Sequence, residues 1–436
     1  MSATPADPAV LAPHQRWLIL AAAFLAWMFA GLEISLFILI HRQMMIGVSY
    51  PLRLDEAEIT RWFAWFQAAF LFGAAAGGWL FGMLGDRFGR RLGLGLAVLC
   101  YSLWTLACFP AATIKGLIIF RFLACLGIGG VWPNAVALTV EAMPNVSRPL
   151  IAGILGAAAN VGFVLMGAIG YFFAITVDDW RWTLLVGATP ALLGFLTLFA
   201  IPESPRWLST RKATAAAASS PMREVFRRPL LYRTLLGIGL GAVPVVGTAA
   251  NANWLVPWSD QVAEERSKSA EVNSKVAKKP ADARVKAKTQ MTRSGGAIFG
   301  SLLGGIVASL IGRRWSYFLI SLATFLISTY IFTMLDPENP QFQWFAFLLG
   351  FAGVTYFGWL PLFLPELFPT RVRSTGAGIS FNTGRVVAGI VVLSAGFLIE
   401  RFGGNYRLVG FWSGMIYVVG MLIIWLAPRS SRQLED

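Results

Sequence analysis

The sequence predicts an all-α membrane protein with twelve transmembrane helices arranged as two parallel-repeated halves of six. Of its 436 residues, 56% are hydrophobic and only 13% are charged, and the mean hydropathy is +0.64. Soluble domains contain roughly 45–50% apolar residues. The charged residues cluster between long apolar runs. This composition excludes a soluble enzyme, a disordered chain and a secreted disulfide scaffold.

Twelve apolar runs are long enough to cross a bilayer, which takes about 20 residues of helix. The predicted spans are 17–41, 60–84, 91–110, 114–140, 149–173, 182–201, 231–258, 293–311, 315–334, 342–365, 373–400 and 406–427. The first run lacks a small-residue cleavage site and carries Glu33, so it is predicted to be a span and not a signal peptide.

Two motifs recur at a nearly constant offset and indicate an internal repeat. Glu141-Ala-Met-Pro144 returns in the second half as Glu366-Leu-Phe-Pro369, and Gly89-Arg90-Arg91 returns there as Gly312-Arg313-Arg314. Six spans bring the chain back to the same side of the membrane. Both Gly-Arg-Arg loops are therefore expected to face one compartment.

The repeat sets the predicted boundaries of the chain. They are a cytoplasmic tail at 1–16, a six-helix half at 17–202, a cytoplasmic linker at 203–230, a six-helix half at 231–427 and a cytoplasmic tail at 428–436. The second half carries a charged insertion at 259–292 on the outer side, expected to be solvated and mobile; the alternative is that it binds anionic headgroups or a partner.

The distribution of basic residues among the loops predicts how the helices are oriented in the membrane. Loops on the side of the N-terminus hold 18 Lys and Arg, against 7 on the opposite side before the segment from Arg266 to Arg293 adds 9 more. The short loops follow the positive-inside rule, which predicts a multi-pass protein of the cell (inner or plasma) membrane with both termini in the cytoplasm.

The loop after the second span, Gly82-Met-Leu-Gly-Asp86-Arg87-Phe-Gly89-Arg90-Arg91, resembles the signature loop of the major facilitator superfamily. Arg121 with Gly127, Gly129 and Glu141, and the segment Pro202-Glu-Ser-Pro-Arg-Trp-Leu208, are similar to its sugar-porter branch. The stretch from Leu364 to Gly378, with Asn382-Thr-Gly-Arg385, is more similar to proton symporters of organic acids, including aromatic-acid, sialic-acid and metabolite carriers. The resemblance implies alternating access and an anionic substrate.

The sequence departs from the sugar porters in two places. Their Gln-rich pattern in span seven is absent, and this chain instead has glycines, Pro244, Asn251 and Asn253 there. Ser309 stands in the second half where Asp86 stands in the first. Sugar transport is therefore not favoured, and the two halves are expected to differ at the cytoplasmic gate.

Glu33 and Arg121 are predicted to lie at the same depth in the membrane. Each is roughly 10–12 Å from the outer end of its span at 1.5 Å per residue. A neighbouring cation favours the charged carboxylate, and loss of that cation in a buried place favours protonation. The resemblance also gives these two positions to the coupling acid and its arginine. The alternative is a permanently paired structural bridge.

Arg385 is predicted to bind the substrate. It lies about 18 Å into its span, close to the middle of a hydrocarbon core of about 30 Å, where a guanidinium can hold a carboxylate with two hydrogen bonds. The alternative is a structural arginine bonded to a helix carbonyl or an acid. Further substrate candidates are its repeat mate Asn160, together with Asn251, Asn253, Tyr356 and Trp359.

Charged residues at the cytoplasmic helix ends form a predicted gate. They are Asp86, Arg90, Glu141, Arg148, Glu203, Arg206, Arg314, Glu366 and Arg373. The resemblance implies that acids of one half bridge arginines of the other when this side is closed, which biases a two-state equilibrium.

The sequence therefore predicts a secondary transporter that imports a small organic anion with protons. Alternatives are a facilitator or exporter of a neutral solute such as a sugar or drug, and a transporter-like sensor or scaffold. No enzyme, metal, cofactor or nucleic-acid role is expected, because the three cysteines lie in apolar runs and only two histidines are present. The expected partners are the solute, protons and the bilayer, with the chain working as a monomer.

Overall fold

The computed structural model describes residues 11–50, 54–143, 146, 148–205, 207–209, 221–273, 284–369, 372–401 and 405–428. Every regular element in these ranges is a helix. The first half contains α1 (Pro13–Ser49), α2 (Glu56–Phe88), α3 (Arg90–Ala107), α4 (Ile114–Ala142), α5 (Arg148–Phe172), α6 (Trp182–Ala188) and α7 (Ala191–Ala200).

The second half follows a short helix, α9 (Pro221–Val225), that precedes its first span. It contains α10 (Leu230–Ala250), η1 (Ala252–Trp254), α11 (Leu255–Asn273), α12 (Arg284–Ile311), α13 (Arg313–Met334), α14 (Phe342–Glu366), α15 (Arg373–Arg401), α16 (Tyr406–Gly414), α17 (Ile416–Ile423) and η3 (Ile424–Leu426).

All twelve predicted spans are present as helices. Within the described residues, eleven helical segments are long and apolar enough to cross a membrane, and α3, with 18 residues, is the twelfth. The sixth span is divided into α6 and α7, and the last into α16, α17 and η3. The twelve-helix fold is therefore confirmed.

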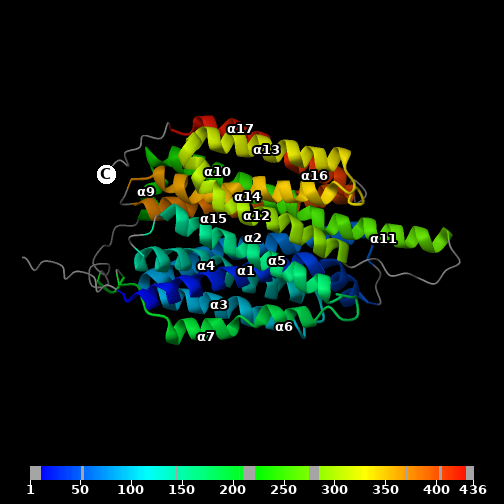
Figure 1. Cartoon of the computed structure of the whole chain (residues 1–436), viewed down its shortest axis with the longest axis horizontal. Helices are drawn as coiled ribbons and strands as arrows, with labels where there is room; N and C mark the ends of the chain where they lie inside the picture. The colour runs from blue at the N-terminus through cyan, green and yellow to red at the C-terminus, as the bar shows by residue number, and fades with distance from the viewer. Residues whose placement is uncertain are drawn as a thin grey trace, which may run out of the picture.

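The two halves lie side by side, α1–α7 in one layer and α10–α17 in the other (Figure 1). The helix pairs α2–α15 and α5–α12 make the main contacts between the halves. Helix α1 begins and α17 ends at the same end of the bundle (Figure 1), as an even number of spans requires.

The repeated Gly-Arg-Arg motif has the same backbone role in both halves. Gly89 has φ +122° and Gly312 has φ +90°, and these are the positive-φ glycines of the described chain. Each glycine separates two consecutive spans, α2 from α3 and α12 from α13. The left-handed region of φ favours glycine because a side chain there would be strained.

The charged insertion predicted at 259–292 is largely helical, which corrects its expected shape. Helix α11 runs to Asn273 and extends beyond the bundle (Figure 1), and α12 begins at Arg284, not at residue 293. Lys286 and Asp260 are both buried, with 3.5 Å between Nζ and Oδ2. This ion pair joins α11 to α12, so only residues 274–283 of the insertion lie outside the described chain.

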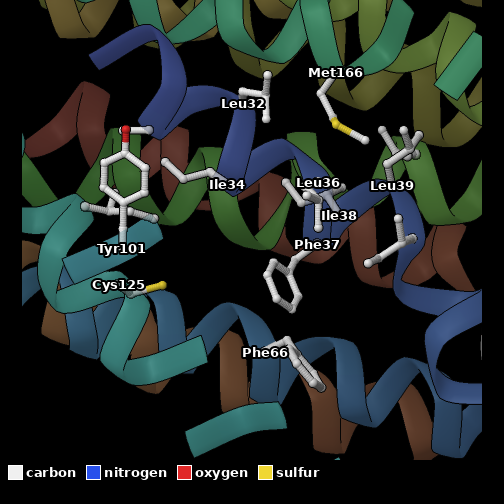
Figure 2. Close-up of a cluster of buried hydrophobic side chains, with 14 of the residues drawn as sticks. Leu32, Ile34, Leu36, Phe37, Ile38, Leu39, Phe66, Tyr101, Cys125 and Met166 are labelled. Atoms are coloured by element: carbon white, nitrogen blue, oxygen red, sulfur yellow. The ribbon is translucent and has the colours of Figure 1, made fainter. Parts of the chain in front are cut away.

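The core of the first half is built from tightly crossing helices. The buried side chains in Figure 2 come from α1, α2, α3, α4 and α5, with Phe37 stacked on Phe66 at 6.0 Å between ring centroids. Helices α2 and α4 cross at glycines: a Cβ at Gly77 would lie 1.8 Å from the Leu126 carbonyl oxygen, and one at Gly129 would lie 2.0 Å from that of Ala74. Small residues allow such close backbone contact between membrane helices.

We expect Gly77→Ala to destabilise the protein by about 1–3 kcal/mol, because the new methyl group overlaps a backbone oxygen that cannot move alone. Melting temperatures in detergent measure this. Gly82→Ala in the same helix is the matched control, since a Cβ there meets nothing within 4 Å and alanine favours the helix. Equal melting temperatures for the two variants would show that the α2–α4 crossing is not tight.

Candidate functional site

A buried ion pair joins two helices of the first half. Arg121 Nη1 on α4 donates hydrogen bonds to both carboxylate oxygens of Glu33 on α1, at 2.5 and 2.6 Å. Arg121 is 1% exposed and Glu33 is 0% exposed. The predicted pairing of these two side chains is therefore confirmed.

Two further contacts hold this pair, and the sequence did not reveal them. Thr105 of α3 donates its hydroxyl to Glu33 Oε1 at 2.9 Å, and the Arg121 guanidinium lies 4.2 Å from the centre of the Phe37 ring. Arg121 Nε has no hydrogen-bond partner. The carboxylate thus depends on one guanidinium and one hydroxyl, so a rearrangement of α1 against α4 would remove the partners of a buried charge.

Arg385 lies at the seam between the halves. Its Nη1 donates to the carbonyl oxygen of Ala74 on α2 at 3.1 Å and to Asn382 Oδ1 at 3.4 Å. The guanidinium lies 4.7 Å from the centre of the Phe381 ring. Arg385 is buried, and none of its contacts in the described chain is a carboxylate.

Tyr356 and Trp359, two of the predicted substrate contacts, lie in the core of the second half. Both are fully buried in the second half, where the Tyr356 hydroxyl donates to Ser321 at 2.7 Å and Trp359 Nε1 donates to the Arg313 carbonyl at 2.9 Å. Both rings pack against Tyr317. Their polar atoms are already bonded to α13, so these side chains stabilise the core of this half.

The three predicted asparagines have different surroundings. Asn251 donates to the Gly410 carbonyl at 2.7 Å and accepts from Ser328 at 2.9 Å, so it joins the start of η1 to α13 and α16. Asn160 donates to the Gly156 carbonyl of its own helix at 3.3 Å. Asn253 Oδ1 is buried without a hydrogen-bond partner. Asn253 therefore has a buried acceptor left for a ligand.

The charges of the first half that are predicted to face the cytoplasm bond to one another. Arg90 pairs with Asp86 and lies 3.6 Å, measured from Nε, from Glu141 Oε1. Glu203 accepts a hydrogen bond from the Arg91 backbone at 3.1 Å, and Ser204 donates to Glu141. These contacts fix the ends of α2, α3 and α4 to the segment after α7.

In the second half, Glu366 pairs with Arg313 at 2.8 Å, and Arg314 donates to the Ala427 carbonyl. The turn at Gly312 brings Arg313 beside the end of α14. The bridges of Arg90 and of Glu366 therefore lie within their own halves, whereas the resemblance implied bridges across the halves while this side is closed. Arg206 and the side chains of Arg148 and Arg373 lie outside the described residues.

Further contacts across the halves lie around the start of α11, and sequence reasoning missed them. Lys286 Nζ donates to Gln43 Oε1 at 2.5 Å, the hydroxyls of Thr60 and Tyr406 are 2.9 Å apart, and Trp254 packs on Phe63 with ring centroids 5.0 Å apart. Placing Lys286 in a solvated loop hid this signal.

Arg293 is a second buried arginine that the sequence analysis did not single out. It is 3% exposed, its guanidinium lies 5.7 Å from the Phe163 ring, and its Nε and Nη2 have no hydrogen-bond partner. The predicted span began at residue 293, which gave Arg293 the place of a helix-end charge. Because α12 already begins at Arg284, this arginine lies well inside the helix.

Comparisons with known proteins identify similar transporters. A family model described as "Sugar (and other) transporter" matches residues 23–228. A probable 4-methylmuconolactone transporter of Cupriavidus pinatubonensis is 28% identical over 82% of this chain and 79% of its own length. A cis,cis-muconate transport protein of Acinetobacter baylyi is 26% identical over 90% of this chain and 92% of its own length.

Solved structures share the fold. The inward-open xylose transporter XylE from E. coli superposes with a TM-score of 0.71 over 96% of this chain and 98% of its own. The two sequences are 17% identical, so this similarity concerns the arrangement of the helices alone.

We expect Arg121→Met to lower stability strongly, because it leaves the Glu33 carboxylate buried without its cation, at a cost of about 3–5 kcal/mol. Adding Glu33→Gln to that variant should recover much of the loss. Melting temperatures of both single variants and the double variant form the cycle. The exposed Arg266, which pairs with Glu338 at 3.1 Å, gives the control Arg266→Met; an equal loss there would contradict a special role for the buried pair.

Proposed function

We propose that the chain is a transporter of the major facilitator superfamily and that it takes up a small organic anion together with protons. The observation that carries the proposal is the contrast between its buried arginines. Arg121 is neutralised by Glu33, whereas Arg385 contacts no carboxylate among the described residues. The first arrangement suits a proton, and the second suits an anionic solute.

Glu33 is the proposed proton carrier. A neighbouring cation such as Arg121 favours the charged form of a carboxylate, and loss of that cation in a buried environment favours protonation. Protonation would in turn release Arg121 from α1. Helix α1 packs along α5, and α5 packs on α12 of the other half, so this change reaches the contact between the halves. A proton bound at Glu33 could thereby bias which side of the transporter is open.

Arg385 is the proposed anchor for the anion. Its Nη1 bonds to the Ala74 carbonyl of the other half, so an anion bound to the guanidinium would lie at the seam that alternating access opens and closes. Substrate sites of transporters built from repeats lie near the membrane midplane between the repeats. The muconate transport protein among the relatives also supports an organic acid.

The proposed direction is uptake into the cytoplasm across the cell membrane. The basic residues of the short loops place both termini inside by the positive-inside rule. The acidic outer compartment of an energised membrane would then supply protons for import.

A ligand screen followed by transport tests this function. Purified protein would be melted with cis,cis-muconate, nicotinate, 4-hydroxybenzoate, sialic acid and xylose, and the stabilising compound tested for uptake into proteoliposomes with an acidic outer buffer. We expect an organic acid to stabilise the protein and to accumulate only with the pH gradient. Stabilisation by xylose alone, with counterflow that is insensitive to pH, would favour a neutral-solute facilitator.

We expect Glu33→Gln to abolish pH-driven accumulation while exchange of pre-loaded solute continues, because the amide mimics the protonated side chain and exchange needs no net proton movement. Uptake with a proton gradient and counterflow are measured in the same vesicles. Glu338→Gln, at an exposed acid, is the control. Undiminished accumulation by Glu33→Gln would exclude the coupling role.

We expect Arg385→Lys to weaken solute binding roughly ten- to a hundredfold, because lysine keeps the charge but loses the planar fork that holds a carboxylate, and such a hydrogen bond contributes about 1.5–3 kcal/mol. The melting temperature of the empty protein should change little. Unchanged affinity with a strongly lowered melting temperature would identify Arg385 as a structural residue.

A further inference from the structure

The buried interior of the described chain carries more positive than negative charge. Its buried lysine and arginine side chains are Arg121, Lys286, Arg293 and Arg385. Its buried carboxylates are Glu33 and Asp260. With histidine counted as neutral, the interior has two cations in excess. A buried charge without a partner is costly, so this excess calls for a compensating ligand.

The pairing identifies which cations are in excess. Arg121 contacts Glu33, and Lys286 contacts Asp260. Arg293 and Arg385 contact aromatic rings and, in the case of Arg385, a carbonyl and an amide oxygen, but no acid in the described ranges. The two uncompensated charges therefore lie on α12 and α15 of the second half.

Arg293 lies on a stretch of α12 where several buried polar atoms have no hydrogen-bond partner among the described residues. Its Nε and Nη2 lack partners, and so do Gln290 Oε1, Ser294 Oγ and Ser301 Oγ on the same helix. All four side chains are buried. Buried polar groups are nearly always hydrogen-bonded in folded proteins. An uncompensated guanidinium on the same helix as three further side chains with unsatisfied polar atoms indicates a place for an anion.

We propose that the transported solute is a dicarboxylate, with one carboxylate bound by Arg385 and the other by Arg293. This inference rests on the proposed function. Arg385 lies about three helical turns from the cytoplasmic start of α15, and Arg293 lies about five turns from the cytoplasmic end of α12. At 1.5 Å per residue, the two Cα atoms differ in depth by about 9 Å. This difference in depth suits an extended ligand with an anionic group at each end, which would neutralise both cations.

The two arginines also contact different helices of the first half. Arg385 bonds to α2 through Ala74, and Arg293 lies over Phe163 of α5. A dicarboxylate bound to both would thus be held where α15 meets α2 and where α12 meets α5. These are the two main contacts between the halves, so binding at both ends would act on the whole seam.

The test compares acids that share a carbon skeleton and differ by one carboxylate. The probes are adipate against hexanoate and cis,cis-muconate against sorbate, with affinity measured by calorimetry on the full-length protein in detergent. We expect the wild type to bind each dicarboxylate about ten- to a hundredfold more tightly than its monocarboxylate, as one added charge-assisted contact predicts. Arg293→Gln should remove this preference and leave monocarboxylate binding nearly unchanged.

Controls separate the site from the fold. Arg266→Gln, at an exposed arginine, should keep the preference. Arg293→Lys, which retains the charge, should keep part of it. The melting temperature of empty Arg293→Gln should not fall, because the variant removes a charge without a partner. A marked fall would instead make Arg293 a structural residue and overturn the inference.

The remaining outcomes distinguish this inference from the proposed function. Equal affinities of wild type for mono- and dicarboxylates, or an equal loss of both in Arg293→Gln, would overturn the dicarboxylate site and keep an organic-anion transporter. A preference that persists in Arg293→Gln would exclude Arg293 from the site. If no carboxylate binds and xylose does, the proposed function itself has failed.

Discussion

Glu33 and Arg121 can both be buried only while they are in contact, and this constraint sets the arrangement of the first half. The pair fixes α1 against α4, and the Thr105 hydroxyl adds α3 to the same group. The free-energy cost of removing a charged group from water is offset only by close contact with the opposite charge and by further hydrogen bonds. Any motion that separates these helices must therefore break the pair and leave two buried charges without their partners.

Helix α1, which carries Glu33, packs tightly on α5 through glycines. A Cβ at Gly31 of α1 would lie 2.1 Å from the Ala159 carbonyl of α5, and one at Gly162 of α5 would lie 1.9 Å from the Met28 carbonyl of α1. Helices in contact through their backbones cannot slide without collision. Helix α5 in turn packs on α12, where Arg293 lies. A continuous series of packed helices therefore joins the ion pair of the first half to Arg293 in the second.

The halves share a backbone repeat but use charge differently. Both have a positive-φ glycine before an Arg-Arg pair. In the first half, Arg90 pairs with Asp86 and lies beside Glu141. In the second half, Arg313 pairs with Glu366 at the end of α14. Ser309 stands where the first half has Asp86, and it bonds to its own helix at Gly305. Different ion pairs therefore join the corresponding helix ends in the two halves.

The sequence by itself determined the spans, the repeat and the shared depth of Glu33 and Arg121, because these follow from counting residues along helices of known rise. It did not determine which side chains already have partners. Tyr356 and Trp359 each donate a hydrogen bond to α13, and Arg385 bonds to a carbonyl of the other half. Arg293 is buried with no acid beside it among the described residues. Those facts depend on how each helix is rotated and which helix it meets. Hydropathy fixes depth in the membrane, whereas only tertiary packing fixes direction around each helix axis.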